Sequence, residues 1–317
     1  MTNTCFEILR PGINTTIQDT GRDCLYHMGI TVSGAIDQRN YKLANYLTNN
    51  KLNEAVIEFA YQGPLLKLKN GKINFAITGD IFFNIIRNNS KIEKGNCYQN
   101  YILNDGEQID IISTKKSAYG YLSVSGGFVL EETWGSYSIN TKAQIGPNDG
   151  KKYSINEKIF IKKSIIENIK DKKINYKGFF DNIIRVIKGT NFDYFSDEAK
   201  NIFFNETYSV TRLTDRMGMR LDGPNLENKV NTNIKSEGLI RGVIQVPADG
   251  KPIILLSDHG TIGGYPKIAT VISADLDKVA QLSPGAKIQF KEVNLEEAEK
   301  LFKDYTEETN KYLNEHS

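Results

Sequence analysis

The stretch from Ser257 to Ile272 combines residue types that do chemistry with residue types that shape a loop. It contains Asp258, His259, a glycine pair at 263–264 and a Tyr-Pro-Lys run, and a short apolar segment precedes it. The apolar, β-branched ends predict two buried strands, and Pro266 should hold Lys267 at the mouth of the second. The glycine pair can adopt positive φ and let a ligand approach the backbone. Residue types alone fit a binding loop and an ordinary β-hairpin turn equally well.

A second polar stretch lies near the N-terminus, over residues 15–37. Such a long ordered loop, rich in polar side chains, is more often functional than decorative. Asp37 then predicts an N-cap for a helix over 38–47. The polar residues that alternate with its glycines are Gln18, Asp19, Arg22, His27, Ser33 and Asp37.

A third motif, over residues 214–224, places Asp215, Arg216, Arg220 and Asp222 beside glycines. Two arginines and two aspartates can form an ion-pair cluster that fixes a turn, or they can bind a ligand. Residue types leave both interpretations open.

The elements that must position these motifs are mostly strands. In the first half, strand-like segments cover 5–9, 55–59, 64–68, 73–78, 81–86, 108–112 and 119–124, with hairpin turns expected at 71–72 and 105–106. This spacing predicts a closed or sandwiched all-β domain instead of a βαβ array. In the second half we expect strands at 182–187, 208–213, 242–247 and 287–291, and helices at 197–203, 275–281 and from Leu295 onward. The last helix is amphipathic.

Composition narrows the class of protein. The 317 residues include 40 basic and 38 acidic side chains, a net charge of +2 that argues against a dedicated nucleic-acid surface. No apolar run is long enough to cross a bilayer, and the N-terminus lacks the pattern of a secretory signal. Three widely spaced cysteines form neither a disulfide framework nor a metal motif, so no metal is predicted. We expect a cytoplasmic protein.

Three motifs in order resemble one family, the biotin-dependent carboxyltransferases, also called allophanate hydrolase subunit 2. They are the Thr-Thr-Ile-Gln-Asp-x-Gly-Arg run with Ser-Gly-Ala-Ile-Asp (15–37), Asp-Arg-Met-Gly-x-Arg-Leu-x-Gly-Pro (215–224) and Gly-Gly-Tyr-Pro-Lys-Ile-Ala (263–269). The resemblance implies two cyclophilin-like β-barrel domains, which we assign to 1–165 and 182–292. A lysine-rich, solvated linker (166–181) would join them, and the C-terminal helix would occupy 293–317.

The sequence departs from the family's pattern at two places. Asp23-Cys24 stands where the family usually has Pro-Gly, and His259-Gly260 stands where it often has Arg-Gln. The second change removes a planar donor fork and an amide, so any role of those two side chains is in doubt.

The resemblance also implies function. The family includes the C component of a bacterial ATP-dependent 5-oxoprolinase, which opens the lactam of 5-oxoproline together with components A and B. ATP would then act through the complex. The first alternative is a carboxyltransferase subunit that moves CO2 from carboxybiotin on a partner to a urea-like or amide substrate. A second alternative, of another class, is a regulatory binding protein that acts with its partner subunit.

Both catalytic alternatives need donors aimed at a developing oxyanion and a group that moves a proton. We assign donor or general-acid duty to Lys267 and Arg216, and an orienting role to Asp258 or Asp19. The backbone of Gly263-Gly264 would form an oxyanion cradle, and His259, whose intrinsic pKa is about 6.5, would transfer protons. The predicted substrate-binding residues are Gln18, Asp19, Arg22, Ser33, Asp215, Gly263, Gly264 and Tyr265.

Overall fold

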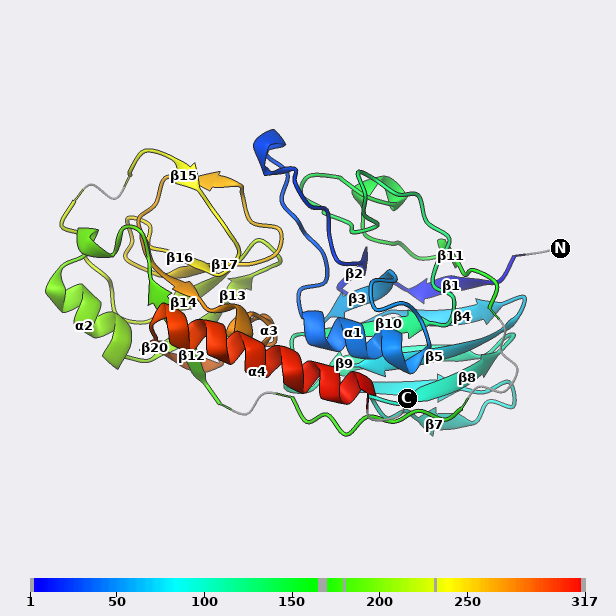
Figure 1. Cartoon of the computed structure of the whole chain (residues 1–317). Coiled ribbons are helices and arrows are strands. Elements are labelled where there is room, and N and C mark those ends of the chain that lie inside the picture. The colour runs from blue at the N-terminus through cyan, green and yellow to red at the C-terminus, as the bar shows by residue number, and fades with distance from the viewer. Residues whose placement is uncertain (1–2, 165–169, 179–180, 231–232, 315–317) are drawn as a thin grey trace. The chain divides into compact units, whose positions relative to one another are not determined.

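The computed structural model describes residues 3–164, 170–178, 181–230 and 233–314 (Figure 1). The chain forms two compact units. The first contains the chain up to residue 22, residues 33–178 and the chain from residue 310. The second contains residues 23–32 and 179–309. Each unit therefore takes in a short segment from the sequence range of the other.

Strands of the first unit pair, within the described residues, into two sheets of six and five strands. The first sheet has the order β11-β1-β4-β9-β6-β7 and the second β2-β3-β10-β5-β8. Their bounds are β1 Cys5–Arg10, β2 Asn14–Gln18, β3 Val56–Ala60, β4 Leu65–Lys69, β5 Lys72–Thr78, β6 Ile81–Ile86, β7 Ile92–Lys94, β8 Asn100–Asn104, β9 Gln108–Thr114, β10 Tyr119–Val124 and β11 Lys158–Phe160.

One hydrophobic core joins the two sheets. Phe6 and Phe83 come from the first sheet, Phe59 and Phe75 from the second, and all four are buried. Alternation along each strand supplies these side chains, since every second residue of β1 and β4 points to the same face. The predicted mainly β fold with peripheral helices is confirmed.

Two predicted hairpins in the first unit are wrong. The turn at Gly71 connects β4 to β5, and the turn at Gly106 connects β8 to β9, yet in both cases the two strands belong to different sheets. Turn residues report that the chain reverses direction, but they do not report which strand it then hydrogen-bonds to.

Helix α1 (Gln38–Leu47) packs on β5 and β10 of the five-stranded sheet (Figure 1). As predicted, the Asp37 carboxylate caps it by accepting a hydrogen bond from the backbone N–H of Asn40, at 2.9 Å. Residues 170–178 cover the same region, because Ile174 and Tyr176 are buried beside Leu43 and Leu47. This part of the expected linker is therefore anchored by two buried side chains, while Lys170, Lys173 and Lys177 are exposed as expected; residues 165–169 and 179–180 lie outside the described residues.

Seven strands of the second unit, within the described residues, form a closed barrel. Its order is β12-β19-β16-β17-β14-β13-β20, and a separate two-stranded ribbon joins β15 and β18. The bounds are β12 Ile183–Lys188, β13 Tyr208–Thr214, β14 Gly218–Asp222, β15 Glu237–Gly238, β16 Val243–Gln245, β17 Ile253–Leu255, β18 Ile262–Gly263, β19 Lys267–Val271 and β20 Lys287–Glu292. Strand β19 begins at Lys267, as Pro266 predicts.

The described part of the second unit also contains the helices α2 (Asp197–Asn205) and α3 (Leu276–Ala280), and α4 (Leu295–Asn314) begins in this unit and ends in the first. Ser196 caps α2 by accepting a hydrogen bond from the Ala199 N–H at 3.0 Å. The half-buried side chains of Leu301 and Tyr305 on α4 pack on Ile272 and Val293. Among the described helices, none combines the length and apolar character that a membrane crossing requires.

Candidate active site in the C-terminal unit

The glycine-rich loop over residues 256–266 is not a hairpin turn. Strands β17 and β19, which it connects, are separated in the barrel by β16, and β16 pairs with both of them. The chain must therefore pass over the end of β16, and on the way it forms β18, which pairs with β15. The hairpin interpretation is wrong, and the crossing encloses space beside the barrel.

Strand register places the polar residues of this region in one row. Arg220 pairs with Ile253, Ile253 with Gln245 and Gln245 with Lys267, across four neighbouring strands. Directly paired residues share a face of the sheet. The adjacent row, through Met219, Ile254, Ile244 and Ala269, is fully buried and fills the barrel interior. The polar row consequently lies on the outer face.

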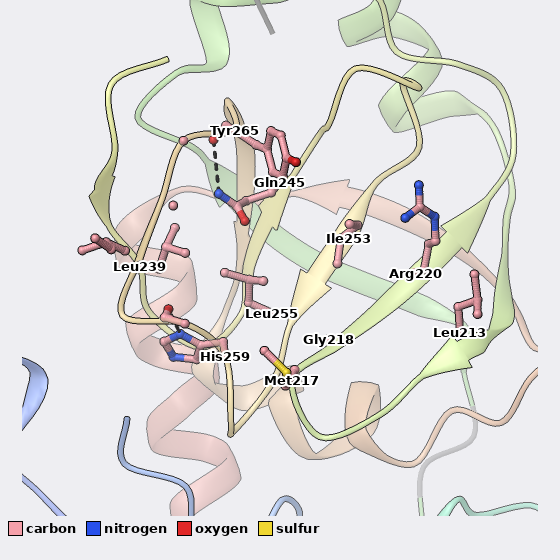
Figure 2. Close-up of a pocket in the computed structure, with 14 residues that line it drawn as sticks. Leu213, Met217, Gly218, Arg220, Leu239, Gln245, Ile253, Leu255, His259 and Tyr265 are labelled. Atoms are coloured by element: carbon pink, nitrogen blue, oxygen red, sulfur yellow. Dashed lines mark hydrogen bonds between the residues drawn. The ribbon is translucent and has the colours of Figure 1, made fainter. Parts of the chain in front are cut away.

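A cavity of about 400 Å3 opens on this outer face, beneath the crossing loop (Figure 2). Its floor is apolar, with Ile253, Leu255 and Leu239, and its polar groups include Gln245 and His259. The remaining lining residues are Leu213, Met217, Gly218, Arg220, Gly260, Ile262, Gly263, Gly264 and Tyr265. A cavity of this size suits a small molecule that has an apolar body and a few hydrogen-bonding groups.

His259 lies in the cavity wall with both ring nitrogens engaged. Its Nδ1 is 2.6 Å from the carbonyl oxygen of Gly260, and its Nε2 is 3.2 Å from the hydroxyl of Tyr26. Because a carbonyl oxygen only accepts, Nδ1 must carry the proton, so in the neutral ring Nε2 accepts from Tyr26. Burial lowers the pKa of His259, while the Gly260 hydrogen bond and Asp258 act in the opposite direction. Burial therefore favours the neutral form of His259, in which Nε2 is a hydrogen-bond acceptor.

Arg216 and Asp258 form a buried, two-pronged ion pair. Arg216 Nε donates to Asp258 Oδ2 at 2.8 Å and Nη2 donates to Oδ1 at 3.2 Å. The backbone N–H of Asp258 also donates to the Arg216 carbonyl, at 2.8 Å. This clamp fixes the β13–β14 turn to the loop that carries His259. The two arginines of the 214–224 motif therefore pair with aspartates outside it, Arg216 with Asp258 and Arg220 with Asp249, and ligand binding by the motif stays a prediction.

Asp215 lies in the same turn and is not one of the residues that line the cavity. Its carboxylate accepts hydrogen bonds from the backbone N–H groups of Met217, at 2.8 Å, and Gly218, at 3.3 Å. These bonds shape the turn between β13 and β14. The predicted substrate-binding role of Asp215 stays a prediction.

Gly263 and Gly264 both line the cavity, but neither has the positive φ that glycine permits. Space explains their residue type instead. A Cβ on Gly263 would lie 2.8 Å from Leu239 Cδ1 and 3.0 Å from Gln245 Nε2. A Cβ on Gly264 would lie 2.9 Å from the carbonyl oxygen of Ile234. The expected positive φ is thus absent at both glycines, and close approach of a ligand to their backbone stays a prediction.

Lys267 is buried beside Gln245 and is not part of the cavity lining. Its ammonium forms an ion pair with Glu237, and Nζ is 3.4 Å from Asn191 Oδ1. The Lys267 hydrogen bond holds the pKa of Glu237 below its usual value. Lys267 consequently lies one strand behind the cavity, already paired with a carboxylate, and its general-acid role stays a prediction.

The four N-terminal candidates, Gln18, Asp19, Arg22 and Ser33, belong to the first unit, and all are buried. We call them, with residues 136–140 that contact them, the Asp19 cluster. The Asp19 carboxylate accepts from the hydroxyls of Ser136 and Ser138, at 2.6 and 2.5 Å, and from the N–H groups of Tyr137 and Gly21, at 2.7 and 2.8 Å.

The other members of the Asp19 cluster bond to the same segment. Gln18 ends strand β2, which the sequence did not predict, and its Nε2 donates to the Ile139 carbonyl at 2.8 Å. Arg22 Nη2 donates to the Ser138 carbonyl at 2.5 Å, and Ser33 Oγ accepts from Asn140 Nδ2 at 3.2 Å. These contacts anchor the 136–140 segment to the first unit.

Sequence reasoning did not select Gln245 or Tyr26 as site residues. Tyr26 is 233 residues away from His259 in the chain, and Gln245 enters the site only through strand register. Among the described residues, no group of three or more His, Cys, Asp or Glu side chains is placed to hold a metal ion.

The barrel, the crossing loop and the three motifs together define the class of protein. The family described as carboxyltransferase domain, subdomain A and B, matches residues 28–292, and the chain belongs to this family. The resemblance drawn from the motifs is confirmed.

Individual members of the family and solved structures show how similar the chain is to particular proteins. The chain is 33% identical, over 93% of both chains, to a Haemophilus influenzae protein named as the C component of 5-oxoprolinase. It is 27% identical to the urea amidolyase of Lachancea kluyveri, over 93% of this chain but 17% of that enzyme. It also superposes on the crystal structure of the K. lactis urea amidolyase with a TM-score of 0.89, over 98% of this chain and 20% of that one. At 24% identity the last likeness shows the fold alone.

Proposed function

We propose that this chain is a subunit of an ATP-dependent 5-oxoprolinase, which opens the lactam of 5-oxoproline to glutamate together with partner subunits. One observation carries the proposal: the alignment with the relative named as the C component of 5-oxoprolinase spans 93% of both chains at 33% identity. The cavity is compatible with this substrate, because 5-oxoproline is a small ring with one amide and one carboxylate. The reaction consumes the lactam, ATP and water and gives glutamate, ADP and phosphate.

In this proposal the chain's cavity holds the lactam, and neutral His259 accepts a proton at Nε2, directly or through the hydroxyl of Tyr26. Arg216 and Asp258 position His259 through their ion pair. Lys267 would supply positive charge from behind the cavity as the carbonyl oxygen becomes negative. ATP would act through the complex, and proteins equivalent to the 5-oxoprolinase components A and B would be the partners.

The experiment is reconstitution. The chain is purified alone and together with the products of neighbouring genes, and glutamate formed from 5-oxoproline is measured with and without ATP. We expect glutamate only when ATP, the partners and this chain are all present. Glutamate formation that continues without this chain, or that ignores ATP, would contradict the proposal.

The Lys267 assignment is tested in the same assay. Lys267→Met should lower turnover about 100-fold, the size of effect that general acid catalysis supplies. Lys291→Met is the matched control, since Lys291 is exposed on β20, and it should leave turnover unchanged. Melting temperatures of both variants show whether the change has unfolded the protein. A folded Lys267→Met variant with normal turnover would remove Lys267 from the mechanism.

The second candidate function is carboxyl transfer from carboxybiotin on a partner to a urea-like substrate. It is favoured by the family match over residues 28–292, which carries the carboxyltransferase description. The two functions separate in one assay. If the second is correct, labelled CO2 passes from a carboxylated biotin carrier to urea, and no glutamate forms from 5-oxoproline.

A further inference from the structure

The Gln245 side chain presents an unused hydrogen-bonding edge to the cavity. Gln245 is buried, and its Nε2 donates one hydrogen to the carbonyl oxygen of Tyr265, at 3.3 Å. Since that carbonyl only accepts, it fixes which end of the amide is nitrogen. The side chain makes no other hydrogen bond within the described residues. The second Nε2 hydrogen and Oε1 are therefore available to a ligand, and Figure 2 shows the amide directed into the space beside the crossing loop.

The space in front of this amide is kept open by a missing side chain. A Cβ on Gly263 would lie 3.0 Å from Gln245 Nε2 and 3.6 Å from Oε1. Leu239, Leu255 and Ile253 form an apolar surface next to it. A flat, largely apolar ring with one polar edge fits between these groups.

A primary carboxamide carries a donor and an acceptor on one edge. It pairs through two parallel N–H···O bonds with any group that has N–H and C=O on the same side. An open-chain secondary amide is trans, with N–H and C=O on opposite sides, and a cis form costs about 2.5–4 kcal/mol. A five- or six-membered lactam is held cis by its ring, and urea presents N–H and C=O side by side. Pairing through two hydrogen bonds would therefore favour lactams and urea over open-chain peptide amides.

We propose that Gln245 is the specificity-determining residue of this cavity and that it recognises the cis-amide edge of a lactam or urea. The inference deepens the proposed function, on which it rests for the choice of 5-oxoproline as probe. It assigns a substrate class, lactams and urea, to this cavity, and no single motif of the sequence indicates that class. It also explains how one outer-face cavity suits both candidate functions, because both substrates share this edge.

The test is direct binding to the full-length chain. Dissociation constants of 5-oxoproline and N-methyl-5-oxoproline are measured by isothermal titration, with ligand-observed NMR for weak binding. The methyl group removes the N–H and leaves the ring and the carboxylate. Wild-type protein should bind 5-oxoproline at least about tenfold more tightly than its N-methyl form, the effect of one lost hydrogen bond with an unpaired partner.

The variant Gln245→Met keeps the length of the side chain and removes the amide. It should bind 5-oxoproline about tenfold more weakly and should no longer distinguish the two ligands. Gln289→Met is the matched control, since Gln289 is exposed on β20, and it should keep the preference. A role of Gln245 in folding alone would change the melting temperature and leave the preference intact.

Three results would overturn the inference: no detectable binding of 5-oxoproline up to about 50 mM, equal binding of both ligands to the wild type, or a preference that survives Gln245→Met. These outcomes separate from the proposed function. If the complex makes glutamate but the Gln245→Met variant still prefers 5-oxoproline over its N-methyl form, only this inference is contradicted. If the chain binds the lactam edge through Gln245 but the complex makes no glutamate, only the 5-oxoprolinase proposal is contradicted.

Discussion

The Asp19 cluster and the outer-face cavity are both built from polar loop motifs, but they use their polar groups in opposite ways. In the Asp19 cluster, the carboxylate accepts four hydrogen bonds from its own unit. At the cavity, Gln245 donates one hydrogen bond to Tyr265, and its side chain makes no other within the part of the chain that the structure describes. Polar residues in a glycine-rich loop predict order in both cases, and only the partners of each group tell anchoring from binding.

The comparison predicts that the two regions respond differently to substitution. Groups that are satisfied inside the fold should affect stability first. Groups that face the cavity should affect ligand binding or proton affinity while leaving stability nearly unchanged. Three changes test this contrast, in order of decreasing effect.

The largest effect is expected from Asp19→Ala. Removal of the carboxylate leaves two backbone N–H groups and two hydroxyls without their acceptor in a buried site, which costs about 5 kcal/mol of unfolding free energy. Urea unfolding followed by circular dichroism measures it. Glu131→Ala, an exposed change in the same unit, should cost less than about 0.5 kcal/mol. A loss below about 1 kcal/mol for Asp19→Ala would mean that the cluster is not an anchor.

Asp258→Asn should have the next largest effect. It leaves the Arg216 guanidinium buried without its full counter-charge, and breaking a buried pair costs about 3 kcal/mol. Because His259 follows Asp258 directly, 5-oxoproline binding should weaken in the same variant. Urea unfolding and isothermal titration check the two effects. Asp304→Asn, on the exposed face of α4, is the control; normal stability of Asp258→Asn would refute the role of a clamp.

The smallest effect is expected from Tyr26→Phe. The Tyr26 hydroxyl donates to unprotonated Nε2 and so favours neutral His259; its removal should raise the His259 pKa. Burial still holds that pKa below the ordinary value, with Asp258 raising it and Arg241 lowering it. NMR titration of the imidazole signals measures the shift, with His259→Gln to assign them and Tyr194→Phe as control. An unchanged pKa would show that the hydroxyl does not act on the ring.

The lowered pKa of His259 also makes the unfolding free energy depend on pH, and stability measurements can check the sign of this dependence. Since the folded-state pKa of His259 lies below the unfolded-state value of about 6.5, the unfolded chain binds more protons between the two values. The unfolding free energy should therefore fall as pH decreases through that window, and less so in Tyr26→Phe.

Local features of the fold could be predicted from sequence because local physics produces them. Asp37 caps the helix that it was expected to cap, the helix expected from residue 197 is present with Ser196 as its cap, and Pro266 places the start of β19 at Lys267. The family motifs, spread in order along the chain, indicated the mainly β class. Non-local pairing was out of reach: β16 is inserted between β17 and β19, so a loop with every mark of a hairpin turn is a crossover.

The prediction of the site was affected most, because the site depends on non-local strand pairing. The row from Arg220 to Lys267 is created by hydrogen-bond register between four strands, and register carries no mark in the residues of any one strand. Arg216 was selected for its charge, yet its partner Asp258 was identified only in the structure. Gln18, Asp19, Arg22 and Ser33 were selected for their polarity, which turned out to serve hydrogen bonds within the first unit.

The exchange of short segments between the two units limits how this gene could be divided. The chain passes between the units four times, near residues 22, 32, 178 and 309, whereas a simple two-domain chain would do so once. A protein cut at residue 178 would supply a barrel without Tyr26, whose hydroxyl contacts His259, and a first unit without Tyr312 and Leu313, which pack on Leu47. Neither fragment would carry a complete set of contacts. Recombination that separates the halves would therefore be selected against, and the two units should be inherited together.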